Sequence, residues 1–381
     1  MAGKLCFLLL MNSSRKGAGR PTVLLDMRPL QGPSGGRGIG AYARGLLSGL
    51  IHAGFDKQVT LLLDVAFDEP ALPAGAYKLA GCRRRSHGHL AAYEDAVALT
   101  ADIQRIAPDV YHAIDFHLPG RSPRPVVVTL HDLIPWAWGG PRMRGERLRY
   151  MAAFRLLRRA DAVIAVSQAT AEDAARLRVA ARQRVRVIQE AADPVFAPRE
   201  GAEERVASRW GIAGPYLLFV GALDARKDPP ALVRAWQAAR ASQPGLYLVL
   251  AGDPGRQAPP SMPGAVQVGR VDDRSLADLY SAAGCLVFPS RYEGFGLPCL
   301  EAMACGCPVA AFRNSSLPEV VDEAGILVED GDGKALGEAA AAMVGERERW
   351  SRAGLQRARK FSWDRTARET IAVYESLMTG P

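Results

Sequence analysis

The sequence contains no apolar run long enough to cross a bilayer, since a membrane-spanning helix needs roughly 18 or more apolar residues. The short apolar run at 5–11 is followed by a polar, basic segment without a small-residue cleavage pattern, so we expect residues 1–20 to be an N-terminal extension rather than a secretory signal. The six cysteines form no pair of C-x-x-C motifs and lie near no histidine cluster, which predicts buried thiols in a reducing cytoplasm and no zinc site.

The charge of the chain is unbalanced, because 48 lysines and arginines against 40 aspartates and glutamates give a formal net charge of +8. This excess predicts attraction to anionic partners such as phosphates, nucleic acid or an acidic membrane surface. Residues 142–159 carry seven arginines, and apolar side chains recur there at helical spacing, at Leu148, Met151, Phe154 and Leu157. We expect a basic amphipathic helix, which either presents a solvated face or attaches peripherally to anionic lipid.

The length of 381 residues favours two domains over a single core. Short apolar runs alternate with longer helical patterns, which predicts parallel sheets covered by helices. The runs lie at 23–26, 59–64, 126–130 and 162–166, and then at 216–221, 246–253, 266–270, 285–290, 308–312 and 325–329. A proline-rich, charged stretch at 193–205 separates the two series, so we predict two doubly wound α/β domains joined near residue 198. Ligands of such sheets bind beyond the carboxyl ends of the strands, here in the cleft between the domains.

Three features follow apolar runs in the first half of the chain. The glycine-rich segment 31–47 opens a helix, and its backbone N–H groups either cradle an anion or form a plain flexible turn, because clean G-x-G-x-x-G spacing is absent. His131 follows the third run, where a lone histidine is either a satisfied structural residue or a site residue. Ser167 ends the fourth run, and Thr170 with Asp173 predicts a capping box; we interpret these as structural.

Two groups of charged residues stand out in the second half. Arg226 and Lys227 follow its first apolar run, where adjacent cations either clamp a diphosphate or are solvated at the surface. The stretch RYEGFGLPCLEAMACGCPV places Glu293 in a loop and Glu301 in the first turn of a short helix that begins at Pro298. A helix N-terminus favours anions, so two carboxylates there suit a ligand with both phosphates and hydroxyl groups. The pattern predicts a nucleoside diphosphate sugar.

This stretch, with seven residues between its two glutamates, resembles the retaining glycosyltransferases of family 4, which have the GT-B fold of two Rossmann-like domains facing across a cleft. The segments GRGIGAYARGLL, TLHDLIP, VGALDARKD and SLPEVV occur in the family's order, and the resemblance covers residues 22–377. It implies an acceptor-binding domain over 1–198, a nucleotide-sugar-binding domain over 199–360, and a C-terminal helix over 361–381 that returns to the first domain. TLHDLIP and EGFGLPCLEAMACG look most similar to bacterial mannosyltransferases of surface polysaccharide assembly.

The resemblance also implies a role for each matching residue, four of them catalytic. His131 would lie above the transferred sugar near the reacting carbon, Glu293 would contact sugar hydroxyls, and Arg226 and Lys227 would stabilise the departing diphosphate. Glu301 would bind the ribose of the donor. Further donor contacts would come from Gly38, Gly40, Gly221, Gly269, Arg270, Val271, Gly294, Phe295, Gly296 and Leu297, with 269–271 facing the nucleobase.

The expected reaction moves a hexose, with retention of the anomeric configuration, from a nucleoside diphosphate sugar to a hydroxyl group of a glycan, glycolipid or small-molecule acceptor. GDP-mannose is slightly favoured as the donor. No D-x-D motif stands in a suitable place, so we expect the transfer to need no metal and no other cofactor. The expected partners are the donor, a carbohydrate or lipid-linked acceptor and an anionic membrane, without nucleic acid, in the cytoplasm or at the inner face of the plasma membrane.

Other functions stay open. A non-catalytic nucleotide-sugar-binding subunit would keep the fold and partner an active enzyme, although the intact set of site residues argues against it. A phosphorylase or an epimerase on the same fold would use free phosphate or no acceptor, and a nicotinamide oxidoreductase is disfavoured because its fingerprint is missing. The segment 189–196 departs from the family, which often has Asn-Gly before the same aspartate; we expect Glu190 to alter interdomain or donor contacts without touching the reaction.

Overall fold

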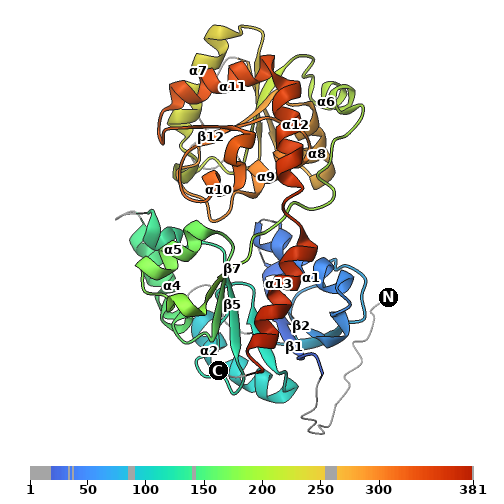
Figure 1. Cartoon of the computed structure of the whole chain (residues 1–381), viewed down its shortest axis with the longest axis vertical. Coiled ribbons are helices and arrows are strands. Elements are labelled where there is room, and N and C mark those ends of the chain that lie inside the picture. The colour runs from blue at the N-terminus through green and yellow to red at the C-terminus, as the bar shows by residue number, and fades with distance from the viewer. Residues whose placement is uncertain are drawn as a thin grey trace.

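The computed structural model describes residues 19–32, 35–36, 38–84, 91–139, 143–253 and 264–379. The predicted N-terminal extension lies almost wholly outside the described residues. Among the residues described, no helix is both long and apolar enough to cross a membrane. The chain builds two parallel sheets, each covered by helices, and the second sheet lies above the first in Figure 1.

The first sheet has seven parallel strands in the order β3-β2-β1-β4-β5-β6-β7. They are β1 (Val23–Asp26), β2 (Val59–Asp64), β3 (Lys78–Cys82), β4 (Val110–Ala113), β5 (Val126–Leu130), β6 (Ala162–Ala165) and β7 (Val185–Val187). The sequence pattern missed β3, β4 and β7. The reason is that β3 and β7 are edge strands with exposed residues, whereas His112 interrupts the apolar run of β4.

Helices cover both faces of the first sheet. They are α1 (Gly38–His52), α2 (Ala91–Ile106), α3 (Ile134–Ala137), α4 (Arg144–Leu157) and α5 (Gln168–Arg176). Successive residues of β1 point to opposite faces, as a strand requires: Val23 and Leu25 pack in the core that contains α1, and Leu24 packs in the core that contains α2. This burial on both faces explains why the central strands are almost wholly apolar.

The second sheet has six parallel strands in the order β10-β9-β8-β11-β12-β13. They are β8 (Tyr216–Val220), β9 (Tyr247–Ala251), β10 (Ala265–Gly269), β11 (Cys285–Phe288), β12 (Val309–Phe312) and β13 (Ile326–Val328). Its helices are α6 (Ala202–Trp210), α7 (Pro229–Ser242), α8 (Asp273–Ala282), α9 (Leu297–Ala304), α10 (Leu317–Val321), α11 (Gly333–Gly345) and α12 (Arg347–Ala358). Every apolar run predicted in this half coincides with a strand, so the predicted fold class is confirmed.

Both sheets have a topological switch point. In the first sheet β1 lies between β2 and β4, and in the second sheet β8 lies between β9 and β11. The connections that leave β1 and β4, or β8 and β11, therefore diverge to opposite sides of the sheet. Such divergence opens a crevice at the carboxyl ends of the strands, where ligands of doubly wound folds bind.

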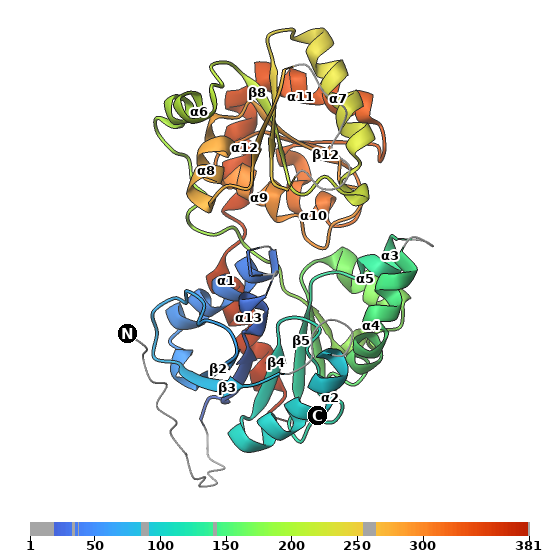
Figure 2. The same ribbon diagram turned by 180° about the vertical axis from the view of Figure 1, so that it is seen from behind.

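The last helix, α13 (Trp363–Ser376), leaves the second sheet and packs on α1 of the first (Figures 1 and 2). Gly45 makes this approach possible, because a Cβ atom there would lie 2.1 Å from the ring of Trp363. Near the other end of the helix, the hydroxyl of Tyr374 is hydrogen-bonded to His112 Nδ1 at 2.6 Å. The C-terminal helix is thus built into the core of the first sheet.

Candidate active site

A cleft of about 550 Å³ lies between the two sheets, at the carboxyl ends of their strands. Its lining includes these predicted site residues: Gly38, His131, Gly221, Arg226, Lys227, Arg270, Val271, Glu293, Gly294, Phe295, Gly296 and Leu297. Three others, Gly40, Gly269 and Glu301, do not line it. Gly40 lies in the first turn of α1 and packs against the segment before the helix, since a Cβ atom there would lie 2.1 Å from the carbonyl oxygen of Gly35.

Backbone geometry after β8 fixes the two adjacent cations. Arg226 and Lys227 belong to a short 3-10 turn, η6 (Ala225–Lys227), whose backbone amides donate hydrogen bonds to the side chain of Asp224. Gly221, with a φ of 136°, turns the chain out of the strand in a conformation that favours glycine. Both cations are thereby brought to the cleft from the end of one central strand.

Glu293 is the centre of a buried charge cluster in the cleft. Its Oε1 accepts hydrogen bonds from Arg226 Nη1 at 2.6 Å, from Lys227 Nζ at 2.6 Å and from Ser290 Oγ at 2.5 Å. Lys227 also lies over the ring of Phe288, with Nζ 4.0 Å from the ring centroid. Burial by itself would raise the pKa of Glu293, but the two cations and the hydrogen bonds lower it to about 2. Glu293 is therefore a carboxylate at neutral pH.

The loop that follows Glu293 brings backbone amides to the same place. Helix α9 begins at Leu297, and Gly296 precedes it with a left-handed φ of 104°. In the part of the chain that the structure describes, the amides of Gly294, Phe295, Gly296 and Leu297 donate no hydrogen bond. They lie at a helix N-terminus, where unpaired amides and the helix dipole attract anions. The site thus combines a fixed carboxylate, two cations and unpaired donors.

The same loop also contacts the first domain. The carbonyl oxygen of Gly294 accepts hydrogen bonds from Ser167 Oγ at 2.5 Å and from Thr170 Oγ1 at 3.1 Å. A Cβ atom at Gly294 would lie 1.9 Å from the carbonyl oxygen of His131, so the close approach requires glycine. Ser167, and not Thr170, is the N-cap of α5, which corrects the predicted capping box. Nothing in the sequence beyond their place after a strand indicated that these hydroxyls bridge the two domains.

A second bridge joins α10 to α5. The carboxylate of Glu319 accepts hydrogen bonds from the amides of Gln168 at 2.8 Å and Ala169 at 3.0 Å, so it neutralises the N-terminus of a helix in the other domain. Nearby, the hydroxyl of Tyr292 is hydrogen-bonded to Asp173. The glutamate of the SLPEVV segment therefore has an interdomain contact, which its sequence position did not reveal.

Glu301 lies in a different environment from Glu293. Because α9 begins at Leu297, one residue earlier than predicted, Glu301 is its fifth residue and stands at the start of its second turn. Its Oε2 accepts a hydrogen bond from the hydroxyl of Tyr280 at 3.2 Å. Burial raises the pKa of Glu301 to about 8, with only partial opposition from Tyr280. Glu301 is therefore mostly protonated at neutral pH.

His131 lies on the first-domain side of the cleft, directly after β5. Its Nε2 is 2.9 Å from the carbonyl oxygen of Ile114, its Nδ1 is 3.2 Å from Glu190 Oε1, and its ring packs edge to face on Tyr42. Burial by itself would lower the pKa of His131, but the hydrogen bond and charge of Glu190 raise it above its ordinary value. Glu190 lines the cleft and contacts the predicted catalytic histidine, and its expected effect on interdomain or donor contacts stays a prediction. The position of His131 relative to the sugar stays a prediction.

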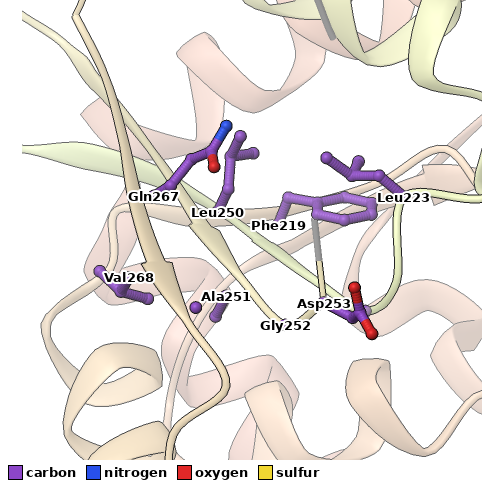
Figure 3. Close-up of a pocket in the computed structure, with 10 residues that line it drawn as sticks. Phe219, Leu223, Leu250, Ala251, Gly252, Asp253, Gln267 and Val268 are labelled. Carbon is purple, nitrogen blue, oxygen red and sulfur yellow. The ribbon is translucent and has the colours of Figure 1, made fainter. Parts of the chain in front are cut away.

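A smaller pocket of about 280 Å³ adjoins the cleft (Figure 3). Phe219, Leu223 and Leu250 line it and belong to the core on the α7 side of the sheet, whereas Val220 lines the main cleft and belongs to the opposite core. The ends of β8 and β9 therefore separate the two spaces. Of the predicted nucleobase contacts, Gly269 lines the smaller pocket, and the two residues after it line the main cleft.

The family of the chain follows from two matches that lie on either side of the domain junction. Residues 36–196 match Glycosyltransferase Family 4, and residues 214–346 match Glycosyl transferases group 1. The chain therefore belongs to the group 1, family 4 glycosyltransferases, which confirms the resemblance found in the sequence. It is a glycosyltransferase with the GT-B fold.

Individual proteins of this kind are similar over most of the chain. O-antigen chain mannosyltransferase B of Escherichia coli is 29% identical over 385 residues, which cover 93% of this chain and 100% of that protein. The serotype-specific mannosyltransferase WbdA of Escherichia coli is 28% identical over 78% of this chain, but the match spans only 41% of WbdA.

Solved structures share the fold. Sucrose-phosphate synthase from Thermosynechococcus elongatus has a TM-score of 0.76 at 24% identity, over 94% of this chain and 100% of that one. Anabaena HepE in complex with UDP-glucose has a TM-score of 0.68 at 18% identity, over 94% of this chain and 100% of that one. At these identities the solved structures establish the two-domain architecture alone.

Proposed function

We propose that this chain transfers a hexose, with retention of configuration and without a metal, from a nucleoside diphosphate sugar to a hydroxyl group of a glycan or lipid-linked acceptor. The observation that carries the proposal is the cluster of Glu293, Arg226 and Lys227 beside unpaired amides in the interdomain cleft. The names of the similar mannosyltransferases support mannose as the sugar and GDP-mannose as the donor. HepE, which binds UDP-glucose, supports a nucleotide sugar as the donor class.

The charge cluster has donors left for a diphosphate. Lys227 has three N–H groups and Arg226 has five, and each donates to Glu293 through a single nitrogen atom. The remaining donors, together with the amides before α9, would hold the two phosphates. Glu293 Oε2, which takes no part in the hydrogen bonds described above, would accept hydrogen bonds from hydroxyl groups of the sugar.

The transfer itself breaks the bond between the anomeric carbon and the diphosphate oxygen. The acceptor oxygen forms a bond to the same carbon on the same face, and its proton passes to an oxygen of the departing diphosphate. The negative charge that grows on the diphosphate is stabilised by Arg226, Lys227 and the helix N-terminus, which are already in place before the reaction. Glu293 is not required as a nucleophile in this scheme.

The test is release of nucleoside diphosphate from a panel of nucleotide sugars, in the presence of EDTA and of a crude glycolipid extract as the acceptor source. We expect one donor to be consumed by the wild-type protein and not by Glu293→Ala or Lys227→Ala. Arg291→Ala is a matched control, because Arg291 is a nearby cation whose ion pairs with Asp228 and Asp330 are long, at 3.7 and 3.6 Å.

The other classes of function give different outcomes in the same assay. Binding of a donor without consumption, with the acceptor extract present, would assign the chain to the non-catalytic class. Consumption that depends on free phosphate would indicate a phosphorylase, and conversion of the sugar without an acceptor would indicate an epimerase. Turnover that EDTA abolishes and Mg²⁺ restores would contradict the metal-free part of the proposal.

We also propose that α4 attaches the enzyme to an anionic membrane that carries its acceptor. Its apolar stripe is only partly covered: Leu157 is buried and Phe154 packs on Trp136, but Leu148 is 69% exposed and Met151 is 39% exposed. Exposed arginines on the same helix would attract anionic lipid. The similar O-antigen chain mannosyltransferase supports a surface-glycan acceptor.

Pelleting with vesicles tests this attachment. We expect binding to phosphatidylglycerol vesicles to exceed binding to phosphatidylcholine vesicles, and the double change Leu148→Ser with Met151→Ser to weaken it at least about tenfold, because burial of two apolar side chains is lost. Val97→Ser is the matched control, since Val97 is 76% exposed on α2 of the same domain. Equal binding to both vesicles would contradict the attachment.

A further inference from the structure

The surroundings of His131 determine where its protons lie. The ring has two nitrogen atoms, and each faces an acceptor: Nε2 lies 2.9 Å from the carbonyl oxygen of Ile114, and Nδ1 lies 3.2 Å from the carboxylate of Glu190. A carbonyl oxygen only accepts, so Nε2 must carry a hydrogen. A carboxylate also only accepts, so the contact at Nδ1 requires a second proton between the two groups.

The other charged and titratable groups around the ring favour a proton on the ring itself. Glu190 and Asp115 both contribute negative charge that raises the pKa of His131, against burial, which lowers it. His112 is the neighbouring group that would oppose a cation, but burial lowers its own pKa to about 3, so it is neutral. Asp132, beside His131 in the chain, lines the same cleft.

The ring is also held in place on its other sides. It packs edge to face on Tyr42, with 4.8 Å between the ring centroids. The hydroxyl of Tyr42 is hydrogen-bonded to Thr129 at 3.0 Å, and Thr129 is hydrogen-bonded to His112 at 2.9 Å. His131 therefore has a fixed orientation, and both of its nitrogen atoms are used by protein groups.

We propose that Glu190 is a positioning residue that keeps a proton on Nδ1 of His131, so that His131 faces the donor as a fixed cation and not as a proton acceptor. The inference rests on the proposed function for its catalytic meaning, because the cation would act on the anionic donor in the cleft. A neutral amide in place of the glutamate would not supply the charge that retains the proton.

The direct test is a pH titration of the full chain labelled with ¹⁵N in its histidines, with His131→Gln to assign the signal. We expect both nitrogens of His131 to stay protonated to a higher pH than those of an ordinary histidine. In Glu190→Gln, which keeps the size and one acceptor atom, we expect the midpoint to fall by about one pH unit or more, which is a tenfold change in proton affinity.

A matched control distinguishes the hydrogen bond between Glu190 and His131 from the effect of nearby negative charge alone. Asp115→Asn removes a nearby negative charge that makes no hydrogen bond to the ring, so its midpoint should shift less than that of Glu190→Gln. A wild-type His131 that is neutral at pH 7, or a midpoint unchanged by Glu190→Gln, would overturn the proposal. The wild-type titration answers the first point even if the variant does not fold.

The catalytic consequence has its own readout. Wild-type kcat should change little between about pH 6 and about pH 8, whereas kcat of Glu190→Gln should fall about tenfold over this interval and recover as the pH is lowered, with a smaller change in KM for the donor. A loss of activity in Glu190→Gln that lower pH does not rescue would mean that the glutamate acts only through structure. If the wild type consumes no donor, the proposed function fails, while the titration still decides the proton position.

Discussion

Glu293 and Glu301 are the same residue type, eight positions apart around one helix N-terminus, yet the fold gives them opposite charge states. Glu293 faces two cations and a hydroxyl group, and its pKa is lowered to about 2. Glu301 faces the hydroxyl of Tyr280, and burial raises its pKa to about 8. Burial by itself raises the pKa of both, so the difference comes from the neighbours that the fold supplies.

The two charge states also give Glu293 and Glu301 different hydrogen-bonding properties towards a ligand. A carboxylate at Glu293 only accepts hydrogen bonds, and it holds the two cations that we propose bind the diphosphate. A protonated Glu301 both donates and accepts, which suits a group that is itself a donor and an acceptor, such as a ribose hydroxyl. The shared sequence motif therefore contains two chemically distinct sites.

The largest effect should come from removing a cation next to Glu293. Lys227→Ala and Arg226→Ala should each lower turnover by roughly 10²-fold or more, because a preorganised group that stabilises the leaving diphosphate is lost. The measurement is the steady-state release of nucleoside diphosphate. Near-normal turnover in both variants would contradict the proposal that Arg226 and Lys227 bind the leaving diphosphate. Glu293 would then have no catalytic cations to hold in place.

Glu293→Gln removes the negative charge that balances the buried Lys227 and the half-buried Arg226. We expect a loss of about 3 kcal/mol in unfolding free energy at neutral pH. The folded pKa is lowered, so the stabilisation by Glu293 is present above its unfolded pKa of about 4.5 and is lost as the pH falls towards 2.

The melting temperatures of wild type and Glu293→Gln should therefore converge at low pH. In binding and activity assays the same variant should impair handling of the sugar more than binding of the free nucleoside diphosphate. The reverse pattern would show that the roles of the two glutamates have been exchanged.

Glu301→Gln removes the carboxyl group that burial keeps protonated. The folded protein keeps a proton on Glu301 that the unfolded chain loses above about pH 4.5, so this group makes the wild type less stable as the pH rises towards 8. The variant lacks that loss, so its unfolding free energy relative to wild type should rise by about 3 kcal/mol between pH 5 and pH 8, and its melting temperature should rise with it. A constant difference across this range would show that Glu301 is ionised in the folded protein.

The smallest effect should come from Glu319→Gln, which weakens the bridge between α10 and α5. The contact of the two domains over the loop that carries Glu293 should become less favourable by about 1 kcal/mol. We therefore expect KM for the donor to rise about fivefold, without a change in melting temperature. Glu323→Gln is the control, because Glu323 is an exposed residue of the same segment. Equal kinetics in both variants would show that the bridge does not hold the loop in place.

Much of the fold was predictable, because it depends on local patterns. Alternating apolar runs predicted all six strands of the second sheet, whereas the edge strands β3 and β7 of the first sheet were missed because exposed strands lack a continuous apolar pattern. The order of the motifs along the chain predicted which residues would lie together in the interdomain cleft. Most of the predicted site residues do line that cleft. The start of α9 was predicted one residue too late, since it depends on the left-handed backbone at Gly296.

The pattern of residues was enough to predict the two doubly wound domains, the family and the positions of the cations and glutamates in the chain. Only the tertiary structure decided their chemical states and partners: the carboxylate at Glu293, the protonated Glu301, the contact of Glu190 with His131, and the bridge from Ser167 to Gly294. A charge state depends on burial and on groups brought from distant positions in the chain, as with Glu190, which lies 59 positions after His131. A local pattern encodes the strand or helix that carries a side chain, but not the side chain that will face it.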